Sequence, residues 1–136
     1  MSGFVVVDTD VFSYLWQGRA IPPSYVNALR GSKPVLSFAS VAEAHFGAAC
    51  ANWGAKKVSQ MEAAMRPYVV APYSPDLAAL WGRLKAEARK DGHPLGQAAQ
   101  TNDLWVCTTA IFHNAPLMTN NMRHFQSMPG LRLVRP

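Results

Sequence analysis

The chain has 136 residues, 49% of them hydrophobic, and a formal net charge of +5. Its two cysteines can form neither a disulfide framework nor a four-cysteine zinc site, and no stretch approaches the roughly twenty apolar residues that span a bilayer. We therefore expect a cytoplasmic protein with no membrane segment, and we expect Cys50 and Cys107 in its core. The positive charge favours a polyanionic or acidic partner, although many basic proteins bind no nucleic acid.

The predicted elements alternate between strands and helices along the chain. The first strand is a β-branched run at residues 4–7 that ends in Asp8 and Asp10. After it we expect helices at 11–17, 22–31, 39–53, 55–66, 74–90 and 98–113, strands at 35–38, 68–71, 116–119 and 131–134, and a loop at 91–94. This alternation predicts one α/β domain over residues 1–136, with a parallel sheet of about five strands flanked by helices on both faces.

Four of the eight acidic side chains lie in apolar surroundings: Asp8, Asp10, Glu43 and Asp103. Burying a carboxylate costs several kcal/mol unless its charge is compensated, and a divalent cation is the simplest partner. A parallel sheet brings the end of the first strand, the helix after the second strand and the helix before the fourth to one edge. Oxygen ligands without a His or Cys cluster favour Mg²⁺ or Mn²⁺ over Zn²⁺.

Each acid also has an ordinary structural interpretation. Asp8 or Asp10 could cap the helix that follows, and Ser40 with Glu43 fits a capping box. Asp103 could lie in the first turn of its helix, where the helix dipole favours an acid. Three independent caps, however, would not need to converge on one edge.

No other chemistry stands out in the chain. There is no glycine-rich phosphate loop, nucleophile elbow or paired-cysteine motif. We expect the tryptophans and tyrosines to be core residues rather than platforms for base stacking. The histidines match no ligand spacing and are predicted to be surface or core residues: His45, His93, His113 and His124.

Taken in order, these motifs resemble the PIN-domain ribonucleases, and among them the VapC-type toxins of prokaryotic toxin–antitoxin pairs. The resemblance extends over nearly the whole chain. It rests on VVDTDVF at 6–12, SVAE at 40–43, GHPLG at 92–96, DLWV at 103–106, LMTNN at 117–121, Phe125 and PGL at 129–131. No single segment is specific, whereas their order and spacing are.

The resemblance implies a set of site residues. They are Asp8, Glu43 and Asp103 as catalytic residues that hold Mg²⁺ or Mn²⁺, with Thr9, Asp10, Asn120 and Asn121 in support. The fourth acid of the family falls at Asn121, where this chain has an uncharged amide, and Asp10 could partly replace the missing charge. We therefore expect one tightly held metal rather than two.

The function implied by the resemblance is that of a Mg²⁺/Mn²⁺-dependent endoribonuclease, the toxin of a type II toxin–antitoxin system. Such an enzyme hydrolyses RNA phosphodiester bonds through a metal-activated water. The implied partners are the RNA substrate, a cognate antitoxin protein and a second copy of the chain in a homodimer.

Two other functions compete with this one. The first is a catalytically inactive PIN-like RNA-binding module in which the acids are vestigial. The second is another Mg²⁺-dependent hydrolase such as a small phosphatase. The chain lacks the aspartyl-nucleophile signature Asp-x-Asp-x-Thr of that class, because Asp8-Thr9-Asp10 continues with Val11-Phe12.

Overall fold

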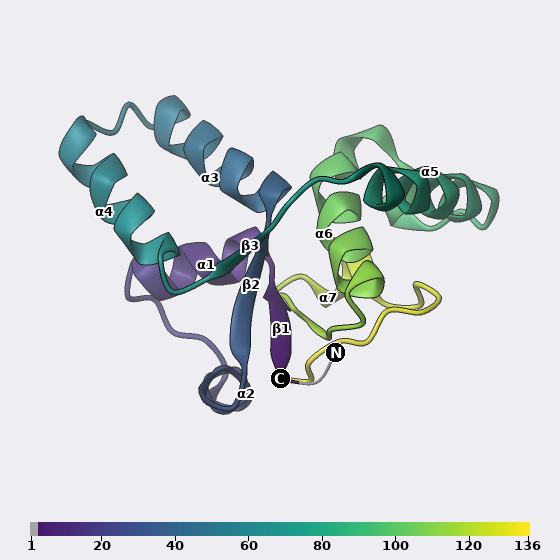
Figure 1. Cartoon of the computed structure of the whole chain (residues 1–136), viewed down its shortest axis with the longest axis horizontal. Coiled ribbons are helices and arrows are strands. Elements are labelled where there is room, and N and C mark those ends of the chain that lie inside the picture. Colours follow the sequence, from purple (N-terminus) through teal and green to yellow (C-terminus); the bar gives the residue numbers. More distant parts are fainter. Residues whose placement is uncertain (1–2) are drawn as a thin grey trace.

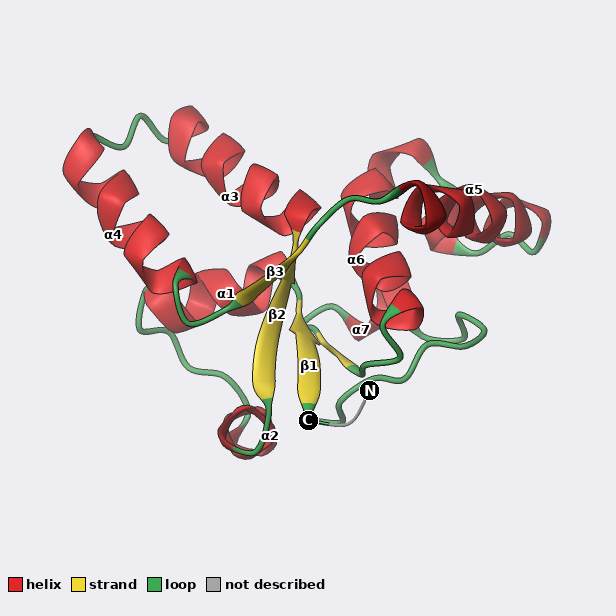
Figure 2. Ribbon diagram, viewed as in Figure 1, coloured by secondary structure: helices red, strands yellow, loops and turns green. Residues whose placement is uncertain are grey.

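A computed structural model describes residues 3–136, so residues 1 and 2 of the expected domain lie outside the described residues. The strands are β1 (Phe4–Val7), β2 (Lys33–Ser37), β3 (Val69–Ala71) and β4 (Leu117–Met118). Within the described chain they form one four-stranded parallel sheet in the order β3-β2-β1-β4 (Figure 2). The predicted α/β class and parallel sheet are confirmed, and β1 lies inside the sheet rather than at an edge.

Helices cover both faces of this sheet, as predicted. They are α1 (Thr9–Trp16), α2 (Pro23–Arg30), α3 (Phe38–Cys50), α4 (Ala55–Met65), α5 (Pro75–Lys90), α6 (Thr101–Phe112) and α7 (Met122–Phe125), with 3-10 turns η1 (Pro94–Gly96) and η2 (Ala98–Gln100). Figure 1 shows α1, α3 and α4 on one side of the strands and α5 and α6 on the other. None of the described helices has the length and apolar character needed to cross a membrane.

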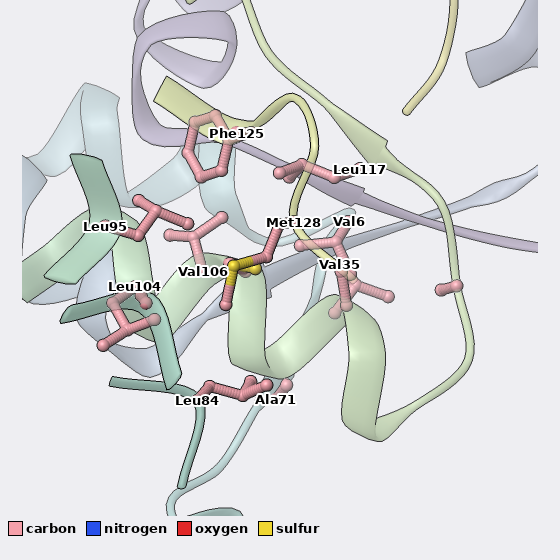
Figure 3. Packing of buried hydrophobic residues seen from close by; sticks show 14 residues of the cluster. Val6, Val35, Ala71, Leu84, Leu95, Leu104, Val106, Leu117, Phe125 and Met128 are labelled. Atoms are coloured by element: carbon pink, nitrogen blue, oxygen red, sulfur yellow. The ribbon is translucent and has the colours of Figure 1, made fainter. Parts of the chain in front are cut away.

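The alternation of side chains along β1 divides the core in two. Val6 packs on the face covered by α5 and α6, together with Leu104 and Phe125 (Figure 3). Its neighbours Val5 and Val7 pack on the opposite face, which α1 to α4 cover. All three valines are fully buried, as expected for a strand inside a parallel sheet. The apolar run that ends in Asp8 is thus the centre of the fold.

The predicted fifth strand at 131–134 is wrong, because that segment forms only an isolated parallel bridge between Leu133 and Leu117. Its two backbone hydrogen bonds to the sheet converge on Leu117, which donates to Arg132 at 2.9 Å and accepts from Val134 at 2.8 Å. Since β4 is only two residues long, it offers no further partner for a ladder. The sheet therefore has four strands among the described residues.

The connection between α5 and α6 also differs from the prediction. The expected long helix at 98–113 begins only at Thr101, and η1 and η2 precede it. Gly96 lets η1 pack directly on α5, because a Cβ atom there would lie 2.6 Å from the backbone nitrogen of Arg89. The Arg89 Nε donates a 3.0 Å hydrogen bond to the Gly96 carbonyl. This contact holds η1 against the end of α5.

Two expectations about the core are wrong. Cys50 is exposed, because it is the last residue of α3 and no element covers it there, whereas Cys107 is buried as predicted. Tyr73 is 58% exposed, because it lies in the connection before α5 rather than on a helix face. Tyr25, by contrast, is fully buried.

Candidate active site

The predicted site residues come together at the carboxyl edge of the sheet. Asp8 follows β1, Glu43 lies in the second turn of α3, Asp103 lies in the first turn of α6, and Asn121 follows β4. They line one open cavity of about 360 Å³, and its lining residues are Asp8, Thr9, Asp10, Ser13, Glu43, Asp103 and Asn121. Asn120 is the exception: its side chain is exposed and lines a neighbouring hollow.

Asp8 caps α1 as well as lining the cavity. Its Oδ1 accepts a 2.8 Å hydrogen bond from the backbone nitrogen of Thr9, and its Oδ2 accepts one of 2.8 Å from the Thr119 hydroxyl. The side chain is only 5% exposed. Burial, with the nearby charge of Asp10, raises the pKa of Asp8 to about 8, and these two hydrogen bonds only partly oppose that shift. Burial thus favours the neutral form of Asp8 in the metal-free protein.

Asp10 carries an unpaired oxygen. Burial raises its pKa, while the backbone N–H groups of Val11 and Asn120 act against that shift. Its Oδ1 is buried and has no hydrogen-bond partner among residues 3–136. An ionised oxygen in that position is costly unless a cation compensates its charge. This unpaired oxygen fits a site that is completed by a metal.

Asp103 and Glu43 have side-chain partners of their own. His124 Nδ1 lies 3.0 Å from Asp103 Oδ2, and Asn102 donates a 3.2 Å hydrogen bond to Glu43 Oε2. Burial raises the pKa of Asp103, and the contact with His124 opposes that shift. Among the described residues, no three His, Cys, Asp or Glu side chains already stand in metal-ligand positions. Asp103 and Glu43 thus line the same cavity, while each carboxylate also contacts a neighbouring side chain.

The set of donors fits a hard divalent cation. Four carboxylates face or border one cavity, Asp10 has an unpaired buried oxygen, and burial raises the pKa values of Asp8, Asp10 and Asp103. Oxygen ligands of this kind suit Mg²⁺ and Mn²⁺. A bound cation would favour the ionised carboxylates and offset their mutual repulsion.

Several residues at or beside the site escaped prediction, among them Ser13, which lines the cavity. The capping box at Ser40 is wrong: Ser37 caps α3, accepting a 3.1 Å hydrogen bond from the Ala39 nitrogen, and Ser40 accepts one of 2.9 Å from the Thr9 hydroxyl. Thr119 was recognised only as part of the motif. His124 lies at the site on α7, a helix too short to show a periodic pattern. A polar residue at or directly after the end of an apolar strand was the available signal for Ser37 and Thr119.

Two of the ordinary structural roles considered for the acids are confirmed, and they are compatible with a place in the site. Asp8 is the N-cap of α1, and Asp103 lies in the first turn of α6. Each carboxylate is therefore stabilised by the partial positive charge of a helix N-terminus as well as lining the cavity. Capping and convergence on one edge are compatible because the helices begin where the strands end.

The comparison with known families decides the classification. The family model for the PIN domain matches residues 5–131. The chain belongs to the PIN domain family. The predicted resemblance is thereby confirmed for almost the whole chain.

Relatives of this PIN domain carry a consistent name. It is 26% identical over 127 residues to ribonuclease VapC2 of Haemophilus influenzae, with 93% of each chain covered. It is also 26% identical over 132 residues to ribonuclease VapC2 of Rickettsia felis, with 94% of each chain covered.

Solved structures share the fold of this PIN domain. VapBC2 of Rickettsia felis, bound to a DNA fragment from its promoter, matches with a TM-score of 0.78 and 24% identity over 96% of each chain. VapBC-1 of nontypeable Haemophilus influenzae matches with a TM-score of 0.79 and 25% identity, again over 96% of each chain. The four-stranded sheet and its helices are thus a known PIN architecture.

Proposed function

We propose that this PIN domain is a Mg²⁺- or Mn²⁺-dependent endoribonuclease of the VapC type, the toxin of a toxin–antitoxin pair. The observation that carries the proposal is the convergence of four carboxylates on one cavity at the carboxyl edge of the sheet. Relatives that align over almost the whole chain are named ribonuclease VapC. The net charge of +5 favours a polyanionic substrate despite the acidic site.

Asp8, Glu43 and Asp103 would hold the cation, with Asp10 beside them. When bound, the ion lowers the pKa of a water molecule and offsets the charge that develops on the phosphodiester oxygens. The site then needs no side-chain nucleophile, in keeping with the absence of a nucleophile motif. These acids would hold the ion in the open cavity at the carboxyl edge of the sheet.

Other residues of the chain hold these acids in place. Thr9 and Thr119 each donate to one oxygen of Asp8, which limits rotation of the carboxylate. The Thr9 hydroxyl also bonds Ser40 and so links α1 to the helix that carries Glu43. Arg123 lines the hollow next to Asn121, where its guanidinium group can contact the phosphates of the RNA backbone.

Cleavage of structured RNA by the purified protein, with and without Mg²⁺ or Mn²⁺, tests this function. We expect metal-dependent cleavage by the wild type and background activity for Asp8→Asn, which removes a central anion without changing the shape of the side chain. Asp91→Asn is a matched control, because Asp91 is an exposed acid at the end of α5. A folded Asp8→Asn protein with full activity would overturn the assignment. Binding of RNA without cleavage would favour the inactive module.

We also infer that a small antitoxin binds across this edge. Structural relatives were solved as VapBC complexes. A mainly apolar hollow of about 230 Å³ adjoins the acids, sharing Thr9, Ser13 and Glu43 with the site and extending to Trp53 and Met61. It suits an apolar partner segment, and an Arg from that segment could pair with the carboxylates and compete with the metal.

Inhibition by the partner can be measured directly. Co-expression with the neighbouring small gene product should suppress RNA cleavage and growth arrest. Trp53→Ser should weaken complex formation, because it removes an apolar wall of the hollow. Cleavage that persists in a verified complex would contradict this mode of inhibition.

A further inference from the structure

The Asp103 carboxylate is held by a histidine from another element. His124 Nδ1 lies 3.0 Å from Asp103 Oδ2, and the amide group of Asn121 lies 2.9 Å from the same ring nitrogen. The side chains of Asp103 and His124 are 23% and 34% exposed, so the contact is largely shielded from water. Phe125, the next residue of α7, is fully buried and anchors the histidine.

The chemistry of the groups fixes the direction of these hydrogen bonds. An ionised carboxylate only accepts, so the Nδ1 proton of His124 is donated to Asp103. The Asn121 amide nitrogen lies 2.9 Å from Nδ1 and 3.3 Å from Nε2 of the ring, and with Nδ1 donating to Asp103 only the unprotonated Nε2 can accept from this amide. Oδ2 of Asp103 is therefore engaged, and no hydrogen bond to Oδ1 occurs among the described residues.

This arrangement is continuous with the support of Asp8. The Thr119 hydroxyl that donates to Asp8 also accepts a 3.0 Å hydrogen bond from the Asn121 backbone nitrogen. Asp8, Thr119, Asn121, His124 and Asp103 thus form one chain of contacts between two of the predicted metal ligands. His124 is the member that determines which oxygen of Asp103 is engaged.

We propose that His124 is a positioning residue that leaves Asp103 one oxygen for the metal and so makes the site selective for Mg²⁺ and Mn²⁺ against Ca²⁺. The inference rests on the proposed function, because it requires a divalent ion among these acids. Mg²⁺ demands near-octahedral coordination, whereas Ca²⁺ accepts more ligands and often takes both oxygens of one carboxylate. The two oxygens of a single carboxylate are too close together to occupy two octahedral corners without distortion.

Calorimetric titration with Mg²⁺, Mn²⁺ and Ca²⁺, each alone, tests the proposal on the wild-type chain and on variants. His124→Ala and His124→Phe both lack the donor, and the Phe variant keeps the volume of a ring. We expect the ratio of Ca²⁺ to Mg²⁺ affinity to rise about tenfold or more in both, the usual scale for residues that orient a ligand. His124→Gln retains an N–H donor and should bring the ratio back toward that of the wild type.

Gln126→Ala is the control, because Gln126 is an exposed residue at the end of the same helix and does not line the acidic cavity. Thermal unfolding shows which variants are folded. If the Ala variant does not fold, the titration of the Phe variant tests the proposal. Folded variants with the wild-type ratio, or with equal loss of all three ions, would overturn the role of His124 and leave the nuclease proposal standing. A wild-type chain that binds none of the three ions would overturn both.

Discussion

The hydroxyl of Thr119 donates a 2.8 Å hydrogen bond to Oδ2 of Asp8, joining two residues that are 111 positions apart in the chain. Both side chains are buried. The carbonyl of Thr119 in turn accepts a 2.6 Å hydrogen bond from the Tyr25 hydroxyl. Adjacent parallel strands end side by side, so β1 and β4 bring this pair together. Residues remote in sequence thereby orient the carboxylate on which the proposed chemistry depends.

Thr119→Val should destabilise the protein and slow RNA cleavage. Valine keeps the shape of threonine but leaves Asp8 Oδ2 and the Asn121 backbone nitrogen without their partner, a loss of about 1–3 kcal/mol in the free energy of unfolding. Thr119→Ser keeps the hydroxyl and is the matched control. Urea unfolding and cleavage rates measure the two effects. Equal stability and equal rates for the two variants would mean that the hydrogen bond to Asp8 is dispensable.

The metal-free protein should become less stable as the pH rises. Because burial and Asp10 raise the pKa of Asp8 to about 8, the folded state keeps a proton that the unfolded chain releases near its ordinary pKa of 3.8. Between these two values the folded state binds more protons, so each increase in pH lowers the free energy of unfolding. The raised pKa values of Asp10 and Asp103 act in the same direction.

Urea unfolding in a chelator across this pH range measures the slope. Asp8→Asn should flatten it and should leave the protein at least as stable near neutral pH, since the variant has no charge to bury. Stability of the metal-free wild type that increases over the same range would contradict the buried, protonated Asp8. Added metal should reduce the loss of stability, because binding displaces the proton.

Asn121→Asp should tighten Mg²⁺ and Mn²⁺ binding, because it restores an anion at the position of the family's fourth acid. Asn121→Leu removes the polar contact with His124 and should weaken binding and slow cleavage, within the tenfold to hundredfold range of changes around a metal site. Calorimetry on both variants and on the wild type compares the affinities. If neither variant changes affinity or rate, Asn121 serves only to connect β4 to α7.

The chain should self-associate through exposed aromatic side chains. Tyr73 and Phe46 are 58% and 70% exposed. Tyr73 contacts Phe38, which packs on Trp105, and Trp105 stacks on Trp81. Trp53, by contrast, packs on Trp16. Sedimentation should show a dimer at micromolar concentration, and Tyr73→Ser should weaken it. A monomer under all conditions, with or without a partner protein, would refute this expectation.

Local sequence patterns were sufficient for the elements that depend on near neighbours. The valines of β1 predicted a buried strand, because a short β-branched run is stable only when both faces are covered. Ser74 predicted the start of α5, and its hydroxyl accepts a 3.1 Å hydrogen bond from the Leu77 nitrogen. The convergence of Asp8, Glu43 and Asp103 followed from the topology, since the carboxyl ends of parallel strands lie at one edge.

Only the tertiary structure decided the residues whose partners come from distant segments. Leu133 forms a single bridge because β4 is short, Ser40 meets Thr9 from another helix, and His124 meets Asp103, which lies 21 positions earlier in the chain. Such contacts leave no periodic pattern in the sequence. Their free energy depends on how the helices of both faces are placed against the sheet, and that placement is set by the packing of the whole core.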